Sequence, residues 1–188
     1  HPDRLHYHSH QQSYIPSQSI RQTADCIRVS KICALVIGKM MHAAELGILL
    51  TVSPDSRCLE KDLLLPMEDY ITIIGNLLEN AIEELSNGEH EIKEITLGLY
   101  CDPDCNIITC EDTGGEIVVV SVDFMDGMDA ADYAMAVAES WGGIGDESLN
   151  NGFLLVYAVG ENKVWAMAGS GIEDALPASK IEGWLEAD

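Results

Sequence analysis

Residues 67–85, MEDYITIIGNLLENAIEEL, form the stretch that decides the fold. Apolar residues recur in it at the three- and four-residue spacing of a helix with one buried face: Ile73, Ile74, Leu77, Leu78, Ala81, Ile82 and Leu85. Acidic residues near its start and the sequence Ser-Asn-Gly after its end match the dipole and capping preferences of helix termini. The stretch therefore predicts a helix whose apolar side must be covered by a sheet.

Two asparagines, Asn76 and Asn80, lie one helical turn apart at the edge of this apolar stripe. Their amides stand one above the other, a spacing that suits the binding of a metal–phosphate group beside a core helix. Two amides on a solvated helix flank have the same spacing, because nothing makes N-x-x-x-N unique to ligand binding. The spacing alone leaves both interpretations open.

The longer run around these asparagines, GNLLENAIEEL, resembles the asparagine box of sensor histidine kinases and of their wider GHKL ATPase superfamily. The resemblance implies that Asn80 ligates the Mg²⁺ that bridges the nucleotide phosphates, and that Asn76 occupies the catalytic-base or polar-relay position. Upstream, IGKMMHAAELGILLTVSPDSR resembles the segment that joins the dimerisation helices to the ATPase domain in citrate- and dicarboxylate-sensing kinases. The resemblance covers residues 20–117, and it implies Mg-ATP as cofactor and a homodimer formed through the N-terminal helix.

Residues 111–116, EDTGGE, resemble the first glycine box of the same kinases, D-x-G-x-G. This implies that Asp112 accepts a hydrogen bond from the adenine amino group and that Gly114 lets the backbone bend around the nucleotide. Glu116 stands where the family has its second glycine. The second glycine box, the ATP lid and a matching phosphoacceptor histidine do not occur in the sequence, so we expect an incomplete ATP-binding signalling module without kinase activity.

The second part of the chain resembles a different family. The runs IVVVSVDFMDGM, WGGIGDESLNNGFLLVYAV and GSGIEDALP are similar, in this order, to motifs of TPM domains. The similarity extends from residue 114 to the end. It implies a small α/β domain, for which divalent-cation binding and acid-phosphatase activity have been proposed.

Both resemblances include residues 112–117, DTGGEI. A join inside a short shared string is what recombination, engineering or misassembly of two genes produces, so we expect a chimera. One divergent domain with only local resemblances is the alternative. Two functions follow: a kinase-like ATP-binding module fused to a TPM-like module, or a TPM-type metal-binding or acid-phosphatase-like domain with the kinase-like part as scaffold.

Candidate metal ligands in the second part are Asp126, Asn150, Asn151 and Glu173. They are expected in loops or at strand ends, where an α/β sheet places its ligand crevice. Their oxygen atoms suit Ca²⁺ or Mg²⁺. Asp126 and Asn151 each precede a glycine, and such pairs also form turns without any ligand. Both interpretations stay open, and Glu173 is the better candidate because its turn needs only the glycines.

The expected fold class is α/β (α+β), with an N-terminal helical segment followed by a mixed sheet with helices, half of it resembling the kinase ATPase domain and half the TPM domain. We divide the chain into a helical segment (1–50), a partial kinase-type ATPase domain (51–117) and a partial TPM-like domain (118–188). Strands on both sides of residues 112–117 are expected to share one sheet, because neither part has enough strands to bury its helices. The predicted helices cover residues 19–47, 67–85 and 129–141 and a last one around Ile181, Trp184 and Leu185, and the predicted strands cover residues 48–52, 92–100, 107–111, 118–123, 153–159 and 164–168.

Composition excludes some partners. With a net charge of −22 and only ten Lys and Arg among 188 residues, the chain lacks the basic surface that nucleic-acid binding requires. It contains no apolar run of 18 residues and no signal-peptide core, so as written we expect a cytoplasmic protein without a membrane segment. The kinase resemblance implies that parent proteins can be membrane-anchored.

The six cysteines include no C-x-x-C pair, so the sequence predicts no zinc site. Cys101 and Cys105 flank an Asp-Pro-Asp turn that can bring them close, but a reducing compartment favours free thiols. The N-terminal histidines His1, His6, His8 and His10 are readable either as a frayed arm or as a set of metal ligands.

Overall fold

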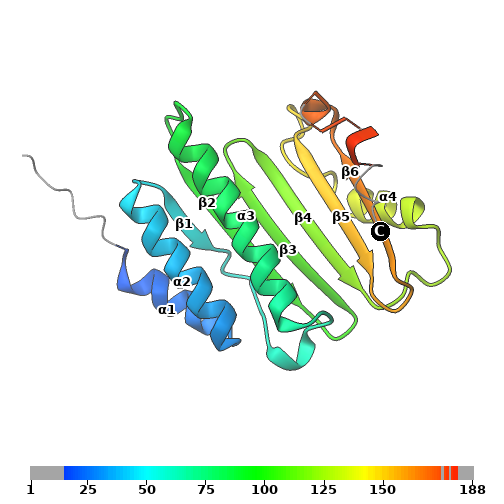
Figure 1. The fold of residues 1–188 in the computed structure, drawn as a ribbon, viewed down its shortest axis with the longest axis horizontal. Helices are drawn as coiled ribbons and strands as arrows, with labels where there is room; N and C mark the ends of the chain where they lie inside the picture. The colour runs from blue at the N-terminus through cyan, green and yellow to red at the C-terminus, as the bar shows by residue number, and fades with distance from the viewer. Residues whose placement is uncertain (1–14, 175, 178, 182–188) are drawn as a thin grey trace, which may run out of the picture.

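One six-stranded sheet forms the centre of the protein, in the order β1-β2-β3-β4-β5-β6 (Figure 1). The computed structural model describes residues 15–174, 176–177 and 179–181. The first half contains α1 (Ser17–Cys26), α2 (Ser30–Glu45), β1 (Leu49–Val52), the 3-10 turn η1 (Glu60–Asp62), α3 (Met67–Asn87), β2 (Glu94–Cys101) and β3 (Cys105–Asp112). The second half contains β4 (Gly115–Val122), α4 (Ala130–Ser140), β5 (Gly152–Ala158), β6 (Lys163–Ala168) and the 3-10 turn η2 (Ser170–Ile172).

The sheet is mixed and runs without interruption through the region shared by the two resemblances. β1 and β2 are parallel, β2, β3 and β4 are successively antiparallel, β5 is parallel to β4, and β6 is antiparallel to β5. The β3–β4 ladder continues to its last pair, Asp112 with Gly115, so the turn between the strands is tight. The expected fold class and the shared sheet are both confirmed.

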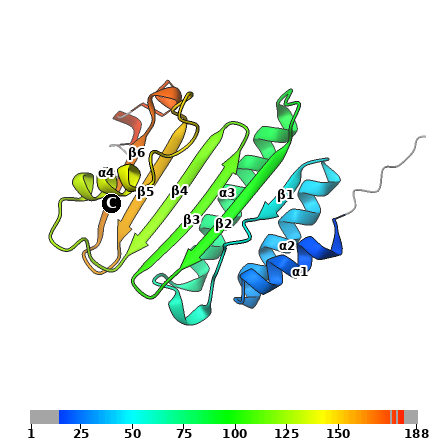
Figure 2. The same cartoon turned by 180° about the vertical axis from the view of Figure 1, so that it is seen from behind.

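Helices cover both faces of the sheet, each over a different part. α1, α2 and α3 lie on one face, and α4 lies on the other, where it packs against β5 and β6 (Figures 1 and 2). Successive side chains of β4 point to opposite faces of the sheet, so the strand contributes to the core on each face. Val119 faces the core under α1–α3, whereas Val118 and Val120 belong to the core under α4. The two cores therefore share strands and lie back to back across one sheet.

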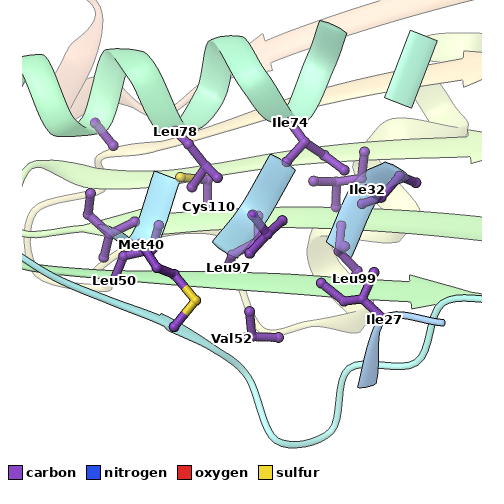
Figure 3. Close-up of a cluster of buried hydrophobic side chains, with 14 of the residues drawn as sticks. Ile27, Ile32, Met40, Leu50, Val52, Ile74, Leu78, Leu97, Leu99 and Cys110 are labelled. Carbon is purple, nitrogen blue, oxygen red and sulfur yellow. The ribbon is translucent and has the colours of Figure 1, made fainter. Parts of the chain in front are cut away.

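The core under α1–α3 is the larger of the two, and the buried face of α3 covers it. Ile74 and Leu78 point from α3 toward the sheet and lie close to Leu97 and Cys110 (Figure 3). The predicted helix is confirmed: it starts at Met67, continues two residues beyond Leu85 and is capped by Gly88. Its predicted apolar face is also confirmed, with Ile73 and Leu77 half-buried at the rim.

The single helix predicted for residues 19–47 was wrong, because the chain forms two helices there. Between α1 and α2 the backbone is extended, and Ile27 forms a parallel bridge with Cys58. The Arg28 N–H donates to the Cys58 carbonyl at 2.9 Å, and the Cys58 N–H donates to the Cys26 carbonyl at 3.0 Å. The break buries Ile27 almost completely. Gly47, at φ +74°, follows the end of α2 as predicted.

The remaining predicted strands and the helix at 129–141 are confirmed, with bounds that differ by a few residues. The carboxylate of Asp129 accepts a hydrogen bond from the Ala131 N–H at 2.9 Å and caps α4. The N-terminal histidines at positions 1, 6, 8 and 10, and Trp184 and Leu185, lie outside the described residues. In the described part of the chain, no helix is both long and apolar enough to span a bilayer.

We predict that the two cores unfold together. Leu78 in the first core and Leu154 in the second are both fully buried, so replacing either by Ala should lower the free energy of unfolding by about 2–5 kcal/mol. Denaturant unfolding followed by far-UV circular dichroism and by tryptophan fluorescence checks this, and Leu149→Ala, at an exposed position, should change stability by less than about 0.5 kcal/mol. Two separate transitions, each shifted by only one of the core variants, would contradict the shared sheet.

Candidate functional site

An acidic cavity of about 430 Å³ lies on the face of the sheet opposite α3, where β3 turns into β4 and where β5 begins. Strand alternation explains its position. Ile95 and Leu97 of β2 point into the core under α3, so Glu94 and Thr96 point to the opposite face. The cavity is lined by Ile92, Glu94, Thr96, Glu111, Asp112, Thr113, Gly115, Glu116, Gly145, Asp146, Leu149 and Asn151.

The lining carries five carboxylates, Glu94, Glu111, Asp112, Glu116 and Asp146, and no Lys, Arg or His. Two of these groups are direct cross-strand neighbours, because Glu111 of β3 pairs with Glu116 of β4. Side chains in such a pair are about 5 Å apart at Cβ, and like charges placed directly opposite destabilise the sheet. The cavity therefore has a negative field that attracts cations.

The loop before β5, residues 142–151, closes one side of the cavity. The Asn151 amide donates to the Gly114 carbonyl at 2.9 Å and accepts from the Asp146 N–H at 2.8 Å. The Gly145 N–H donates to a Glu116 carboxylate oxygen at 2.8 Å. Gly145 needs to be glycine, because it has φ +80° and an added Cβ would lie 2.6 Å from the Gly152 nitrogen. These contacts fix the loop against the β3–β4 turn.

Asp146 holds the same loop in a compact turn. One of its carboxylate oxygens accepts hydrogen bonds from the Ser148 hydroxyl, from the Ser148 N–H at 2.8 Å and from the Leu149 N–H at 3.0 Å. The Ser148 hydroxyl and these backbone donors stabilise the charged form and lower the pKa of Asp146 below its ordinary value. The group is fully exposed and stays ionised at neutral pH.

The asparagines of the kinase-like motif lie away from this cavity. Asn76 and Asn80 are exposed on α3, and neither belongs to the lining of the acidic cavity. One oxygen of Asp112 accepts hydrogen bonds from the Gly114 N–H at 2.7 Å and the Gly115 N–H at 3.1 Å, so it builds the β3–β4 turn. The nucleotide-binding roles of Asn76, Asn80, Asp112 and Gly114 remain predictions.

The candidate ligands of the second part do not gather at one place. Asp126 and Gly127 have φ of +53° and +80°, and the Met128 N–H donates to the Met125 carbonyl at 3.0 Å. These values describe a type I′ turn. The turn follows the C-terminal end of β4, whereas the acidic cavity lies at the N-terminal end of that strand. The turn interpretation therefore accounts for the Asp126 backbone, while a ligand role stays untested.

Glu173 lies at the other end of the strands. It follows η2 and lines a second cavity, of about 410 Å³, together with apolar residues such as Met135 and Trp165. The strands between Asp126 and Glu173 have six to eight residues, which at about 3.3 Å per residue separates the two by roughly 20–26 Å. They belong to different places on the surface. Of the predicted metal ligands, only Asn151 lines the acidic cavity.

Asn150 has a role in positioning the loop. It has φ +48°, its side chain donates to the Ser170 hydroxyl at 2.9 Å, and its carbonyl accepts from the Gly171 N–H at 2.9 Å. These bonds connect the loop before β5 to η2. Within residues 15–174, 176–177 and 179–181, no three Asp, Glu, His or Cys side chains converge closely enough to hold a metal ion.

Sequence reasoning missed the glutamates of the cavity. The signal for Glu94 and Glu111 was present, because polar residues alternate there with the buried residues of β2 and β3. Their meeting depends on register, which places Thr96 opposite Glu111 and Glu111 opposite Glu116. Asp146 gave no comparable signal, because its position depends on how a glycine-rich loop folds back.

The second half of the fold is similar to a known protein family. The model of the TPM domain matches residues 109–187, a region that begins within β3 and includes β4, α4, β5 and β6. The expected TPM similarity is therefore confirmed for this region.

Two sensor kinases are each similar to only part of this chain. The sensor protein CitS of Halalkalibacterium halodurans is 36% identical over 83 residues, which is 44% of this chain and 15% of CitS. The sensor histidine kinase DpiB of Escherichia coli (strain K12) is 29% identical over 102 residues, which is 52% of this chain and 18% of DpiB. The chain thus spans less than a fifth of either relative, and the similarity to sensor kinases is partial.

We predict that Ser148 depresses the pKa of Asp146. Because the pKa is lowered in the folded protein, the loop contacts of Asp146 contribute at pH above its ordinary pKa and are lost as the pH falls through the folded value. Carboxylate titration by NMR should show the low pKa, and Ser148→Ala should raise it. Ser140→Ala, which removes a hydroxyl bonded to the Val137 carbonyl on α4, is the matched control and should leave it unchanged. An ordinary Asp146 pKa in the unmodified protein would refute the assignment.

Proposed function

We propose that this chain is a TPM-type module that binds divalent cations, with the kinase-like part acting as its scaffold. The observation that carries the proposal is the cross-strand pair Glu111–Glu116 inside a cavity lined by five carboxylates and no basic side chain. Two like charges held opposite each other raise the energy of the empty site. A cation between them relieves that repulsion.

The donor chemistry of the cavity fits a hard cation. The carboxylates and the carbonyl oxygen of the Asn151 side chain are oxygen donors of the kind that suits Ca²⁺ or Mg²⁺. In the described residues no three such side chains already converge, so the carboxylates must turn toward the ion. Ca²⁺ accepts flexible geometry and Mg²⁺ demands a near-ideal octahedron, so the proposal favours Ca²⁺. We expect a dissociation constant of about 10⁻⁴–10⁻³ M, as in weak calcium modules.

The kinase-like part has a structural role in this proposal. β2 supplies Glu94 and Thr96 to the cavity on one face and is covered by α3 on the other. Removing the packing of α3 would therefore disturb the register that aligns Thr96, Glu111 and Glu116. One face of these strands packs against α3, and the opposite face lines the acidic cavity.

The proposal concerns binding and not catalysis. The acid-phosphatase activity suggested for TPM domains stays an implication of the resemblance.

Calcium binding tests the proposal directly. Isothermal titration of the metal-free protein with CaCl₂ should show saturable binding, and Glu111→Gln combined with Glu116→Gln should weaken it at least tenfold, about 1.4 kcal/mol. The matched control is Asp126→Asn combined with Glu173→Gln, which removes the same charge at the two places that the sequence suggested. An equal loss of Ca²⁺ affinity in both variants would indicate attraction by the overall negative charge of the protein and not a defined site. A loss only in the control would place the site at Asp126 or Glu173. Absence of saturable binding would contradict the proposal.

Weak nucleotide binding is a second candidate. One observation favours it: Asp112 follows Cys110 at the two-residue period of β3, and Cys110 faces α3. The strand register therefore places Asp112 on the side of α3, the helix that carries Asn76 and Asn80, although at the end of β3 Asp112 also lines the acidic cavity. The engagement of Asp112 in the turn and the absence of the lid motif weigh against tight binding.

We also infer that the chain joins parts of two families near residues 112–117. The TPM match from residue 109 onward and the partial kinase similarity support this inference. Two intact parent genes in the source genome would support it, and intact homologues with this same domain order in other genomes would overturn it.

We predict that the chain is not a histidine kinase. Phosphoryl transfer depends on positioning and on neutralising the phosphates, and neither the second glycine box nor a lid motif is present to do so. Affinity for Mg-ATP should be of millimolar order, about −4 kcal/mol. Incubation with labelled ATP and Mg²⁺ checks this. Acid-labile phosphate on any of the six histidines, abolished by Asn80→Ala but not by Asn87→Ala at the end of α3, would show that the prediction is wrong.

A further inference from the structure

Two buried cysteines, Cys58 and Cys101, are in direct contact. Their Sγ atoms are 3.3 Å apart, and both side chains lie in the core under α1–α3 with exposures of 1% and 2%. The sequence instead suggested that Cys101 approaches Cys105. Cys105 packs against the other core, on the face of α4, so the strand alternation separates those two thiols.

The backbone holds Cys58 and Cys101 in register. Arg57 forms a parallel bridge with Tyr100, the Arg57 N–H donates to the Leu99 carbonyl at 2.7 Å, and the Cys101 N–H donates to the Arg57 carbonyl at 2.8 Å. Cys58 and Cys101 are the next pair along this short ladder. Neighbouring strands lie about 4.8 Å apart, within the Cα separation of about 4.4–6.8 Å that a disulfide spans. Closure therefore requires side-chain rotation and little backbone movement.

We propose that Cys58 and Cys101 form a redox modification site, which hydroperoxides convert to an intramolecular disulfide. The reaction needs only the two thiols and one molecule of oxidant, of which hydrogen peroxide is the simplest. The bond would close a loop over residues 58–101, which contains η1, α3 and β2. Because Cys58 also pairs with Ile27, the disulfide would tie the break between α1 and α2 to β2.

The contact assigns different roles to the two sulfurs. The Cys101 S–H donates to the Cys58 sulfur, which lowers the pKa of Cys58 and raises that of Cys101. Burial of the thiol, and after it the nearby carboxylate of Asp62, act in the opposite direction on the pKa of Cys58 but are the weaker influences. Cys58 is thus the nucleophile and Cys101 the resolving thiol.

The steps balance as follows. The Cys58 thiolate attacks one peroxide oxygen, the O–O bond breaks, and Cys58 becomes a sulfenic acid while the released hydroxide takes up the thiol proton as water. The Cys101 sulfur then attacks the Cys58 sulfur. The S–O bond breaks, the departing hydroxyl leaves as water with the Cys101 proton, and the S–S bond forms. Two thiols are oxidised by two electrons, and one peroxide is reduced to two waters.

Access to the pair requires a local opening. Residues 53–66, which connect β1 to α3, contain only the turn η1 and the two isolated bridges at Arg57 and Cys58, so this segment is the natural place for a water-sized oxidant to enter. Cys26 and Cys33 are more exposed than the pair. Exposure alone would predict that these two react first, whereas proximity predicts a disulfide between Cys58 and Cys101.

Peptide mapping of the folded, peroxide-treated protein tests the proposal. Trypsin cuts after Arg57 and Lys61, so Cys58 is released in a four-residue peptide. A second protease that cleaves before aspartate cuts at Asp102 and Asp104 and separates Cys101 from Cys105. The expected product is this short peptide joined to the one that carries Cys101, with the loss of two hydrogens. Closing a loop of this length should also raise the Tm by about 5–15 °C, and dithiothreitol should reverse the rise.

Single substitutions supply the controls. Cys58→Ala and Cys101→Ala should each abolish the cross-link and the shift in Tm, and Cys105→Ala should leave both intact. A cross-link between Cys101 and Cys105 would overturn the proposal, as would oxidation confined to Cys26 or Cys33. If Cys58→Ala does not fold, the peptide map of the peroxide-treated protein with all six cysteines still shows whether Cys58 and Cys101 are cross-linked.

Discussion

Packing of α3 against β2 and β3 is the interaction on which the rest of the structure depends. Its buried face, centred on Ile74 and Leu78, covers Leu97 and Cys110 and fixes one side of those strands as core (Figure 3). Alternation then sends Glu94, Thr96 and Glu111 to the opposite side, where they line the acidic cavity. A one-residue slip in either strand would exchange the two sets, so the position of the site follows from the same register that builds the core.

The second consequence concerns how two partial families form one fold. β4 continues the ladder of β3 and begins that of β5, so its residues contribute to cores on both faces. The tight turn from Asp112 to Gly115 makes this possible, because the Asp112 carboxylate accepts hydrogen bonds from the backbone N–H groups of the turn. A residue that the kinase resemblance assigns to adenine recognition thus has a structural task here. Both families can share the string DTGGEI because a hairpin needs such a turn whatever it binds.

Most of the fold could be predicted from the sequence, and most of the candidate site could not. The periodicity of α3 and the strand patterns depend on local sequence, which explains their agreement with the structure. The break at Ile27 depends on pairing with Cys58, a partner distant in sequence, so helical periodicity continued through it. The acidic cavity depends on the register of three strands and on the loop before β5. Asn151 was identified because the sequence places it in a loop at a strand end, whereas Glu116 was noted only as a departure from the glycine box.

The central claim is that one sheet crosses the junction of the two resemblances, and cross-strand NOEs in the isotope-labelled protein test it most directly. The account predicts contacts between Ile108 and Val119 across β3 and β4, and between Val119 and Leu155 across β4 and β5, together with slow amide exchange on both sides of residues 112–117. Cross-strand contacts that stop at β3, with fast exchange throughout β4, would contradict it.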